Sequence, residues 1–163
     1  MKVIFLDIDG VLNYINYFKK INNIRLNYNK YLKDNEYNLI KKLLEIDIDK
    51  LYLLKEICDR TNSKVVISSS WRILNFYPLI EDYLIKLSIP VIDITDYIHS
   101  KRGIEIKTYL KKHPEITNYI ILNDDIFPDF DCELLFHLVH TNFYNEGINE
   151  DNVNDAIYKL NIK

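Results

Sequence analysis

The chain has 163 residues, a length that fits one domain, and folding a domain of this size buries about 70% of the surface that the unfolded chain exposes. Hydrophobic residues make up 48% of it, which excludes a disordered protein and provides a core without disulfides or a structural metal. The net charge of -3 and the pI of about 5.8 exclude a global positive field for nucleic acid, although a local basic groove stays open.

Short apolar runs alternate along the chain with segments of helical period. The apolar runs predict strands at residues 3–6, 65–67, 90–94, 119–122 and 134–140. The helical segments predict one helix capped by Asp49, helices at about 78–87 and 103–112, and a last helix capped by Asn149. This alternation predicts an α/β fold, in which helices cover both faces of a parallel central sheet. We expect residues 1–163 to form a single domain.

Residues 13–38 do not fit this alternation. The stretch is rich in Tyr, Asn and Lys and is long for a connection in an α/β unit. It forms either a small lid over the edge of the sheet or irregular packing, and we favour the lid.

The cysteines and histidines give no sign of a disulfide or a metal site. Cys58 and Cys132 have no CxxC partner, which predicts reduced, partly buried thiols. His137 and His140 are three apart on the predicted strand 134–140, so they should lie on opposite faces and share no metal. The apolar run at the N-terminus is too short for a signal peptide, and no segment is long enough to span a membrane. We therefore expect a cytoplasmic protein.

The strongest candidate site is Asp7-Ile8-Asp9-Gly10, at the end of the first predicted strand. Carboxylates at the end of an apolar run must be paired, hydrated or bound to a cation, because an unpaired buried charge is costly. A divalent ion such as Mg²⁺ removes this cost and makes the pair useful for catalysis. Gly10 permits the sharp turn that lifts both side chains out of the sheet. The alternative is an acidic turn that only caps the strand.

Hydroxyl groups follow the second predicted strand. The side chains of Ser68, Ser69 and Ser70, with nearby backbone N–H groups, can donate to a phosphoryl oxygen, although serines also end strands without binding anything. Arg72 either clamps a phosphate or forms a surface ion pair. We expect Trp71 to pack rather than to bind substrate.

Two further charged groups are expected at the same edge of the sheet. Asp124 and Asp125 follow the fourth predicted strand, and the carboxyl ends of parallel strands meet where sites form in such folds. They would add oxygen ligands for the Mg²⁺ at Asp7. Lys101 and Arg102 stand at the start of a predicted helix, where a cation opposes the helix dipole. Neutralising the charge of a transferred phosphoryl group explains them better, and we favour Arg102.

The order of these segments resembles the haloacid dehalogenase (HAD) superfamily, and in particular the small HAD domains of nucleic-acid (RNA) repair proteins. The resemblance rests on segments 7–13, 68–72 and 102–106, on the acidic pair after the fourth strand, and on the tail from 141. It covers nearly the whole chain. The first segment is highly specific, the serine and acidic segments are moderately so, and the basic segment is weak.

The resemblance implies a Rossmann-like HAD fold with a minimal cap or none, and a Mg²⁺-dependent phosphohydrolase that forms an aspartyl-phosphate. Asp7 would be the nucleophile, which also binds Mg²⁺. Asp9 would be the acid and base, with its backbone carbonyl on the metal. Ser69 would hold the phosphoryl group and Arg102 would stabilise it. Asp124, helped by Asp125, would complete the metal site.

The same resemblance leaves the direct metal ligand and the substrate open. Asn123 stands where close relatives often carry an acidic residue, so either Asp124 or Asp125 could be the ligand. The residues expected to bind the substrate are Gly10, Ser68, Ser70, Arg72 and Lys101. The partner would be a phosphorylated molecule, either a nucleic-acid 3′-phosphate end, which a small cap suits, or a nucleotide or another small molecule. Neither a membrane nor an obligate protein partner is expected.

Two functions of another class fit the sequence less well. A receiver-like signalling domain carries its first acidic pair as adjacent residues and its phosphoacceptor on a middle strand, whereas Asp7 and Asp9 are spaced by one and the middle strand ends in serines. A non-catalytic phosphate-binding domain would be expected to have lost Asp7 or Asp9. The sequence disfavours both.

Overall fold

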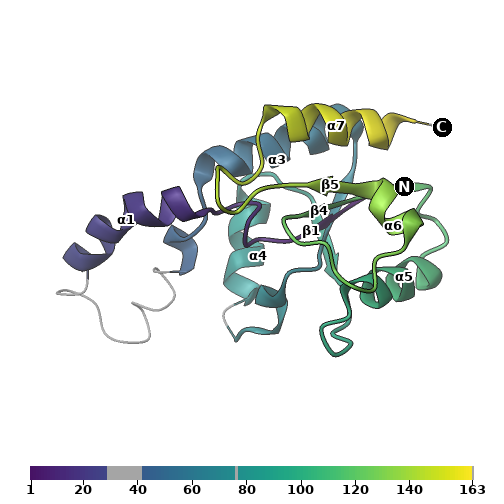
Figure 1. The fold of residues 1–163 in the computed structure, drawn as a ribbon, viewed down its shortest axis with the longest axis horizontal. Helices are drawn as coiled ribbons and strands as arrows, with labels where there is room; N and C mark the ends of the chain where they lie inside the picture. Colours follow the sequence, from purple (N-terminus) through teal and green to yellow (C-terminus); the bar gives the residue numbers. More distant parts are fainter. Residues whose placement is uncertain (29–41, 76, 163) are drawn as a thin grey trace.

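The computed structural model describes residues 1–28, 42–75 and 77–162 of the chain. In this part five strands form one sheet, and every neighbouring pair runs parallel. The strands are β1 (Lys2–Leu6), β2 (Lys64–Ile67), β3 (Val91–Ile94), β4 (Asn118–Asn123) and β5 (Leu138–His140). Their order is β3-β2-β1-β4-β5, so β1 lies in the middle. Helices cover both faces (Figure 1), which confirms the predicted α/β fold.

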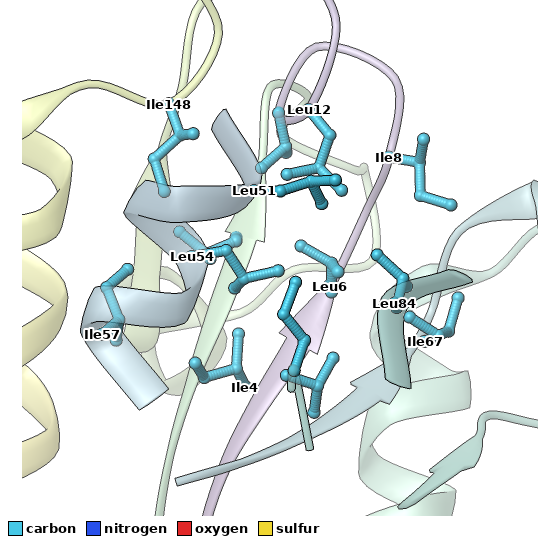
Figure 2. Close-up of a cluster of buried hydrophobic side chains, with 14 of the residues drawn as sticks. Ile4, Leu6, Ile8, Leu12, Leu51, Leu54, Ile57, Ile67, Leu84 and Ile148 are labelled. Atoms are coloured by element: carbon cyan, nitrogen blue, oxygen red, sulfur yellow. The ribbon is translucent and has the colours of Figure 1, made fainter. Parts of the chain in front are cut away.

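Two hydrophobic clusters hold the helices to the sheet. One face carries α3 (Ile48–Thr61), α4 (Tyr77–Lys86) and α7 (Glu150–Asn161), and the other carries α5 (Arg102–Lys112) and α6 (Cys132–His137). Side chains of β1 alternate between the two faces, so Ile4 and Leu6 enter the first cluster (Figure 2) while Val3 and Phe5 enter the second. All four are fully buried, and each contributes about 1.5–3 kcal/mol through that burial.

Part of the stretch 13–38 forms the helix α1 (Ile15–Tyr28), which extends away from the sheet (Figure 1). Its first turn is fixed to the body of the protein, because the Ile15 N–H donates to the Phe143 carbonyl at 2.9 Å. The hydroxyl of Tyr17, in the same turn, contacts two backbone carbonyls at 3.1 Å, those of Leu44 and Ile46. Residues 29–38 lie outside the described part, so the lid stays a prediction.

The segment 134–140 was predicted as one strand, and this prediction is wrong for its first half. Residues up to His137 belong to α6, and β5 begins at Leu138. The helix forms because the Asp131 side chain caps it, accepting a hydrogen bond from the Leu134 N–H at 3.1 Å. An apolar run this short fits either element by its periodicity alone, and the cap decides.

The cap of α3 was predicted two residues too late. Asp47 caps this helix by accepting from the Asp49 N–H at 3.1 Å, and Asp49 lies in the first turn, where its charge suits the helix dipole. The cap of α7 is Asn149, as predicted, and it forms a reciprocal capping box with Asn152.

The histidines also differ from their predicted arrangement. His137 ends α6 and stacks on Tyr119 with ring centroids 4.0 Å apart, whereas His140 on β5 contacts the Asp124 carbonyl through Nε2 at 2.7 Å. Both cysteines are free, but Cys132 is exposed rather than partly buried. None of the described helices is both long and apolar enough to cross a membrane.

Candidate active site

The predicted site residues meet where β1, β2 and β4 end. Asp7 follows β1, the three serines follow β2, Asp124 follows β4, and Arg102 begins α5. They surround an open pocket of about 330 Å³. Its lining consists of Asp7, Asp9, Ser70, Ser100, Arg102, Asp124, Asp125, Phe127 and Phe143. The parallel sheet therefore brings together groups that are far apart in the sequence, at the edge where α/β folds bind ligands.

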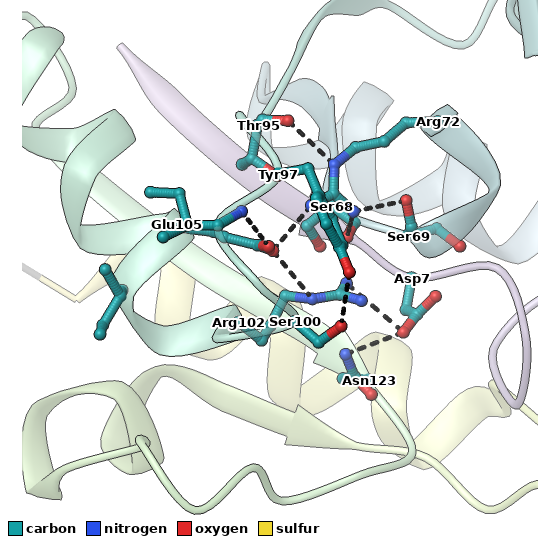
Figure 3. A network of polar contacts seen from close by, with 12 residues as sticks. Asp7, Ser68, Ser69, Arg72, Thr95, Tyr97, Ser100, Arg102, Glu105 and Asn123 are labelled. Atoms are coloured by element: carbon teal, nitrogen blue, oxygen red, sulfur yellow. Dashed lines mark hydrogen bonds and ion pairs between the residues drawn. The ribbon is translucent and has the colours of Figure 1, made fainter. Parts of the chain in front are cut away.

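Asp7 is buried and lines this pocket, and Figure 3 shows its polar contacts. Its Oδ1 accepts from the Ile8 N–H at 2.7 Å, and its Oδ2 accepts from the Asn123 side chain at 3.1 Å. Burial raises the pKa of Asp7, and the Arg102 guanidinium and the Ser69 hydroxyl oppose that rise. Asn123 thus supplies a donor to Asp7 rather than another negative charge.

Asp9 is exposed, yet both of its carboxylate oxygens are hydrogen-bonded. Oδ1 accepts from the Asn13 side chain at 2.8 Å, and Oδ2 accepts from the Trp71 indole N–H at 2.8 Å. Asn13 is itself held, because its Oδ1 accepts from the Gly10 N–H at 3.1 Å. The turn after β1, through Asn13, and the segment 68–72, through Trp71, therefore both donate to the carboxylate of Asp9.

The three serines occupy different depths. Ser70 is exposed and lines the pocket, while Ser68 and Ser69 are fully buried beneath it. The Ser69 hydroxyl lies beside Asp7, where it lowers the pKa of that carboxyl, and it also accepts from the Trp71 N–H at 3.3 Å. The Ser68 hydroxyl is buried and has no hydrogen-bond partner among the described residues.

Arg102 reaches the floor of the pocket from the start of α5. Its Nη1 lies 3.5 Å from Asp7 Oδ2, and its Nε lies 3.5 Å from Glu105 Oε2 (Figure 3). This Nη1 is buried and makes no hydrogen bond to any described residue. A buried N–H without an acceptor is costly, so the position is suited to an incoming oxygen.

Arg72 is not among the residues that line the pocket. Its guanidinium donates to Glu105 Oε2 at 2.7 Å, and its remaining N–H groups donate to backbone carbonyls (Figure 3). Those carbonyls belong to Ser68, Ser69, Thr95 and Asp96. The side chain is 2% exposed and is absent from the pocket lining, so the structure presents none of its donors there. Lys101 is exposed and also lies outside the lining.

The acidic residues fit a bound Mg²⁺ ion. In the described chain no three His, Cys, Asp or Glu side chains form a ready metal cage. Mg²⁺ does not require one, because it is usually held by one or two carboxylates, with water and phosphate oxygens as the other ligands. Asp7 and Asp124 both line the pocket and offer carboxylates of this kind. The pKa of Asp124 is raised to about 6 by burial and then by Asp125 and Asp7, a crowding that a cation would relieve.

Gly10 makes room for this arrangement. Its φ of +70° favours glycine, and a Cβ at this position would lie 2.1 Å from Asp124 Cγ. Any larger residue would therefore push Asp124 out of the site. Gly10 therefore permits the predicted turn and also leaves the space that the Asp124 side chain occupies.

Comparison with protein families matches residues 3–153 to the HAD domain in Swiss Army Knife RNA repair proteins. The chain belongs to this family. The curated proteins and the solved structures contain no significant match to it. The resemblance inferred from the sequence is thus confirmed. The chain is a HAD-type hydrolase domain, and domains of this superfamily generally use Mg²⁺.

Several residues of this HAD domain that shape the pocket were not singled out from the sequence. Asn13 is four residues after Asp9 and ends the segment 7–13, but no role was predicted for its side chain, and an Asn in the turn after an acidic pair is a signal that could have been used. Trp71 was expected only to pack. It does pack, being 2% exposed, but it also binds Asp9. Phe127 and Phe143 lie in loops after β4 and β5, where no periodicity marks them.

Proposed function

We propose that this HAD domain is a Mg²⁺-dependent phosphohydrolase that cleaves phosphate monoesters through an aspartyl-phosphate on Asp7, and that its substrates are nucleic-acid 3′-phosphate ends. The observation that carries the chemistry is the buried Nη1 of Arg102, which lies 3.5 Å from Asp7 Oδ2 and has no hydrogen-bond acceptor among the described residues. A phosphoryl oxygen bound beside the two side chains would provide that acceptor and bring phosphorus to the carboxylate.

In the first step a carboxylate oxygen of Asp7 attacks phosphorus, and the bond from phosphorus to the ester oxygen breaks. Asp9 gives its proton to the departing oxygen. Arg102 balances the charge on the transferred group, with the Ser69 hydroxyl and nearby backbone N–H groups as further donors. In the second step Asp9 takes a proton from water, the water oxygen attacks phosphorus, and phosphate leaves, which restores Asp7.

Asp7, Asp124 and the Asp9 carbonyl would hold Mg²⁺, with Asp125 beside them. When bound, the ion offsets the negative charge of the phosphate and of the carboxylates around it. Arg72 takes a supporting place in this proposal, because its contacts hold the serine segment and Glu105 rather than a substrate.

The substrate class is supported by the walls of the pocket and by the family. Phe127 and Phe143 line the pocket together with Asp7 and Arg102, and aromatic rings beside a phosphate site suit the stacking of a nucleobase. The pocket is open, so a strand end can enter it. A nucleotide or another small phosphate ester is the second candidate, because the local charge includes few cations beyond Arg102.

Phosphate release from matched substrates tests this proposal. The substrates are one oligonucleotide phosphorylated at its 3′ or its 5′ end, a nucleoside 3′-monophosphate and glycerol phosphate, each with and without Mg²⁺. We expect Mg²⁺-dependent release, fastest from the 3′-phosphorylated oligonucleotide. Asp7→Asn should abolish it, whereas Asp82→Asn on the surface of α4 should not. Full activity of Asp7→Asn would overturn the mechanism, and equal rates for the oligonucleotide and glycerol phosphate would overturn the substrate class alone.

A further inference from the structure

The Asp9 side chain is exposed, yet hydrogen bonds hold it in one position. An exposed aspartate normally samples several rotamers, because water satisfies its oxygens in any of them. Here one oxygen accepts from Asn13 Nδ2 at 2.8 Å and the other accepts from Trp71 Nε1 at 2.8 Å. The carboxyl group is therefore held by two donors, one from the segment 7–13 and one from the segment 68–72.

Both donors are themselves held in place. Asn13 is fully buried, and its other side-chain atom accepts from the Gly10 N–H at 3.1 Å. Trp71 is 2% exposed, packs into the core cluster on the α3 and α4 face of the sheet, and carries the Lys42 ammonium 4.6 Å above its ring. Because neither donor can turn away without breaking core contacts, the position of Asp9 is set by the fold.

We propose that Trp71 and Asn13 are positioning residues for proton transfer, which hold the Asp9 carboxyl group toward the leaving oxygen. This inference rests on the proposed function, in which Asp9 is the acid and base. A general acid must come within about 2.6–3.2 Å of the atom that it protonates. An exposed carboxyl group that is fixed beforehand meets this requirement without an ordering step when the substrate binds.

The two hydrogen bonds leave the proton transfer itself unobstructed. Trp Nε1 and Asn Nδ2 only donate, and each carboxyl oxygen has two lone pairs, so one position on each oxygen stays available for a proton. When the bond from phosphorus to the ester oxygen breaks, Asp9 loses its proton to that oxygen and becomes negative. The two N–H groups already face that charge. In the second step the same carboxylate takes a proton from the attacking water.

The dependence on leaving group separates this role from a merely structural one. An aliphatic alkoxide is a poor leaving group and needs the proton, whereas p-nitrophenolate leaves without it. Trp71→Phe keeps an aromatic ring at this position and removes the N–H together with the five-membered ring of the indole. We expect kcat/KM to fall at least tenfold for glycerol phosphate and less than threefold for p-nitrophenyl phosphate. Asn13→Asp keeps the acceptor for Gly10, removes the donor to Asp9, and should show the same selective loss even if Trp71→Phe folds poorly.

Tyr77→Phe is the matched control, because it removes one polar group from a buried aromatic residue of the same core cluster, away from the pocket. It should leave both substrates unaffected. Equal losses on the two esters in Trp71→Phe and Asn13→Asp, or no loss on either, would overturn the positioning role while wild-type turnover still supports the proposed function. Wild-type protein that releases phosphate from neither ester nor from the 3′-phosphorylated oligonucleotide would overturn the proposed function itself.

Discussion

The surroundings of the two buried arginines, Arg72 and Arg102, differ in one decisive respect. Both contact the same carboxylate, Glu105, which is 1% exposed. Around Arg72 every guanidinium nitrogen donates to a protein oxygen, whereas Nη1 of Arg102 makes no hydrogen bond to a described residue. The donors of the first arginine are all used within the fold, whereas the second has one nitrogen without a hydrogen bond, 3.5 Å from the Asp7 carboxylate.

Burial and charge alone therefore do not identify a binding residue. A buried arginine whose donors are all used stabilises its neighbours, and its removal leaves their charges buried without a partner. A buried arginine with an unused donor carries a desolvation cost, which a bound ligand can offset. The functions of the two residues should therefore separate on mutation, one in catalysis and the other in stability.

The largest expected effect is on catalysis. Arg102→Gln should lower kcat/KM by about 10³-fold, or ~4 kcal/mol, because it removes the charge that faces the transferred phosphoryl group. Lys101→Gln removes the same charge from the adjacent exposed position and should change kcat/KM about twofold or less. Steady-state kinetics on one phosphate ester measures both. Comparable losses in the two variants would remove the distinction on which the assignment of Arg102 rests.

The next effect is on stability. Arg72→Gln should lower the free energy of unfolding by about 3–5 kcal/mol, because it leaves Glu105 buried without its 2.7 Å partner and strips donors from four carbonyls. Denaturant unfolding followed by circular dichroism measures this. Arg60→Gln, which breaks an exposed pair on α3, should cost less than about 0.5 kcal/mol. If Arg72→Gln kept its stability but lost its affinity for substrate, its role would be in the pocket after all.

The smallest effect concerns the acidic side of the pocket, opposite Arg102. The folded state raises the pKa of Asp124 to about 6, so its contribution to stability is fully present below the unfolded value of 3.8 and is lost as the pH rises through 6. In the presence of a chelator the protein should lose on the order of 1 kcal/mol across this window, discounted for the partial exposure of the group.

Thermal melts at pH 5 and pH 8 check this prediction. Asp124→Asn should remove that part of the pH dependence, and Mg²⁺ should stabilise the wild type more than the variant. An identical pH dependence in the two proteins would show that Asp124 is not crowded by its neighbours.

The elements that could be predicted from the sequence are the short, fully apolar runs that alternate with helical segments. This alternation favours central parallel strands for the runs that became β1, β2 and β4, and the chemical groups at their ends follow from the topology. The half of 134–140 that became α6 could not be predicted, because an Asp131 cap outweighs a short ambiguous run. Phe127 and Phe143 lie in loops whose approach to the pocket is set by tertiary packing.

The roles of individual side-chain donors could not be predicted from the sequence either. Arg72 and Arg102 look alike in the sequence, and only the positions of the surrounding carbonyls show which one has donors to spare. Likewise Trp71 matches a packing residue by composition. Its contact with Asp9 joins residues 62 positions apart, which no local pattern encodes.

Trapping of the covalent intermediate tests the central claim most directly. Asp9→Asn should still accept the phosphoryl group from radiolabelled p-nitrophenyl phosphate, since that leaving group needs no proton, but it should hydrolyse the intermediate slowly. After acid quenching, we predict that the label is found on Asp7 and that it is absent in the double variant that also carries Asp7→Asn. Label on another residue, or turnover by the wild type without any labelled protein in either form, would contradict the assignment of Asp7 as the nucleophile.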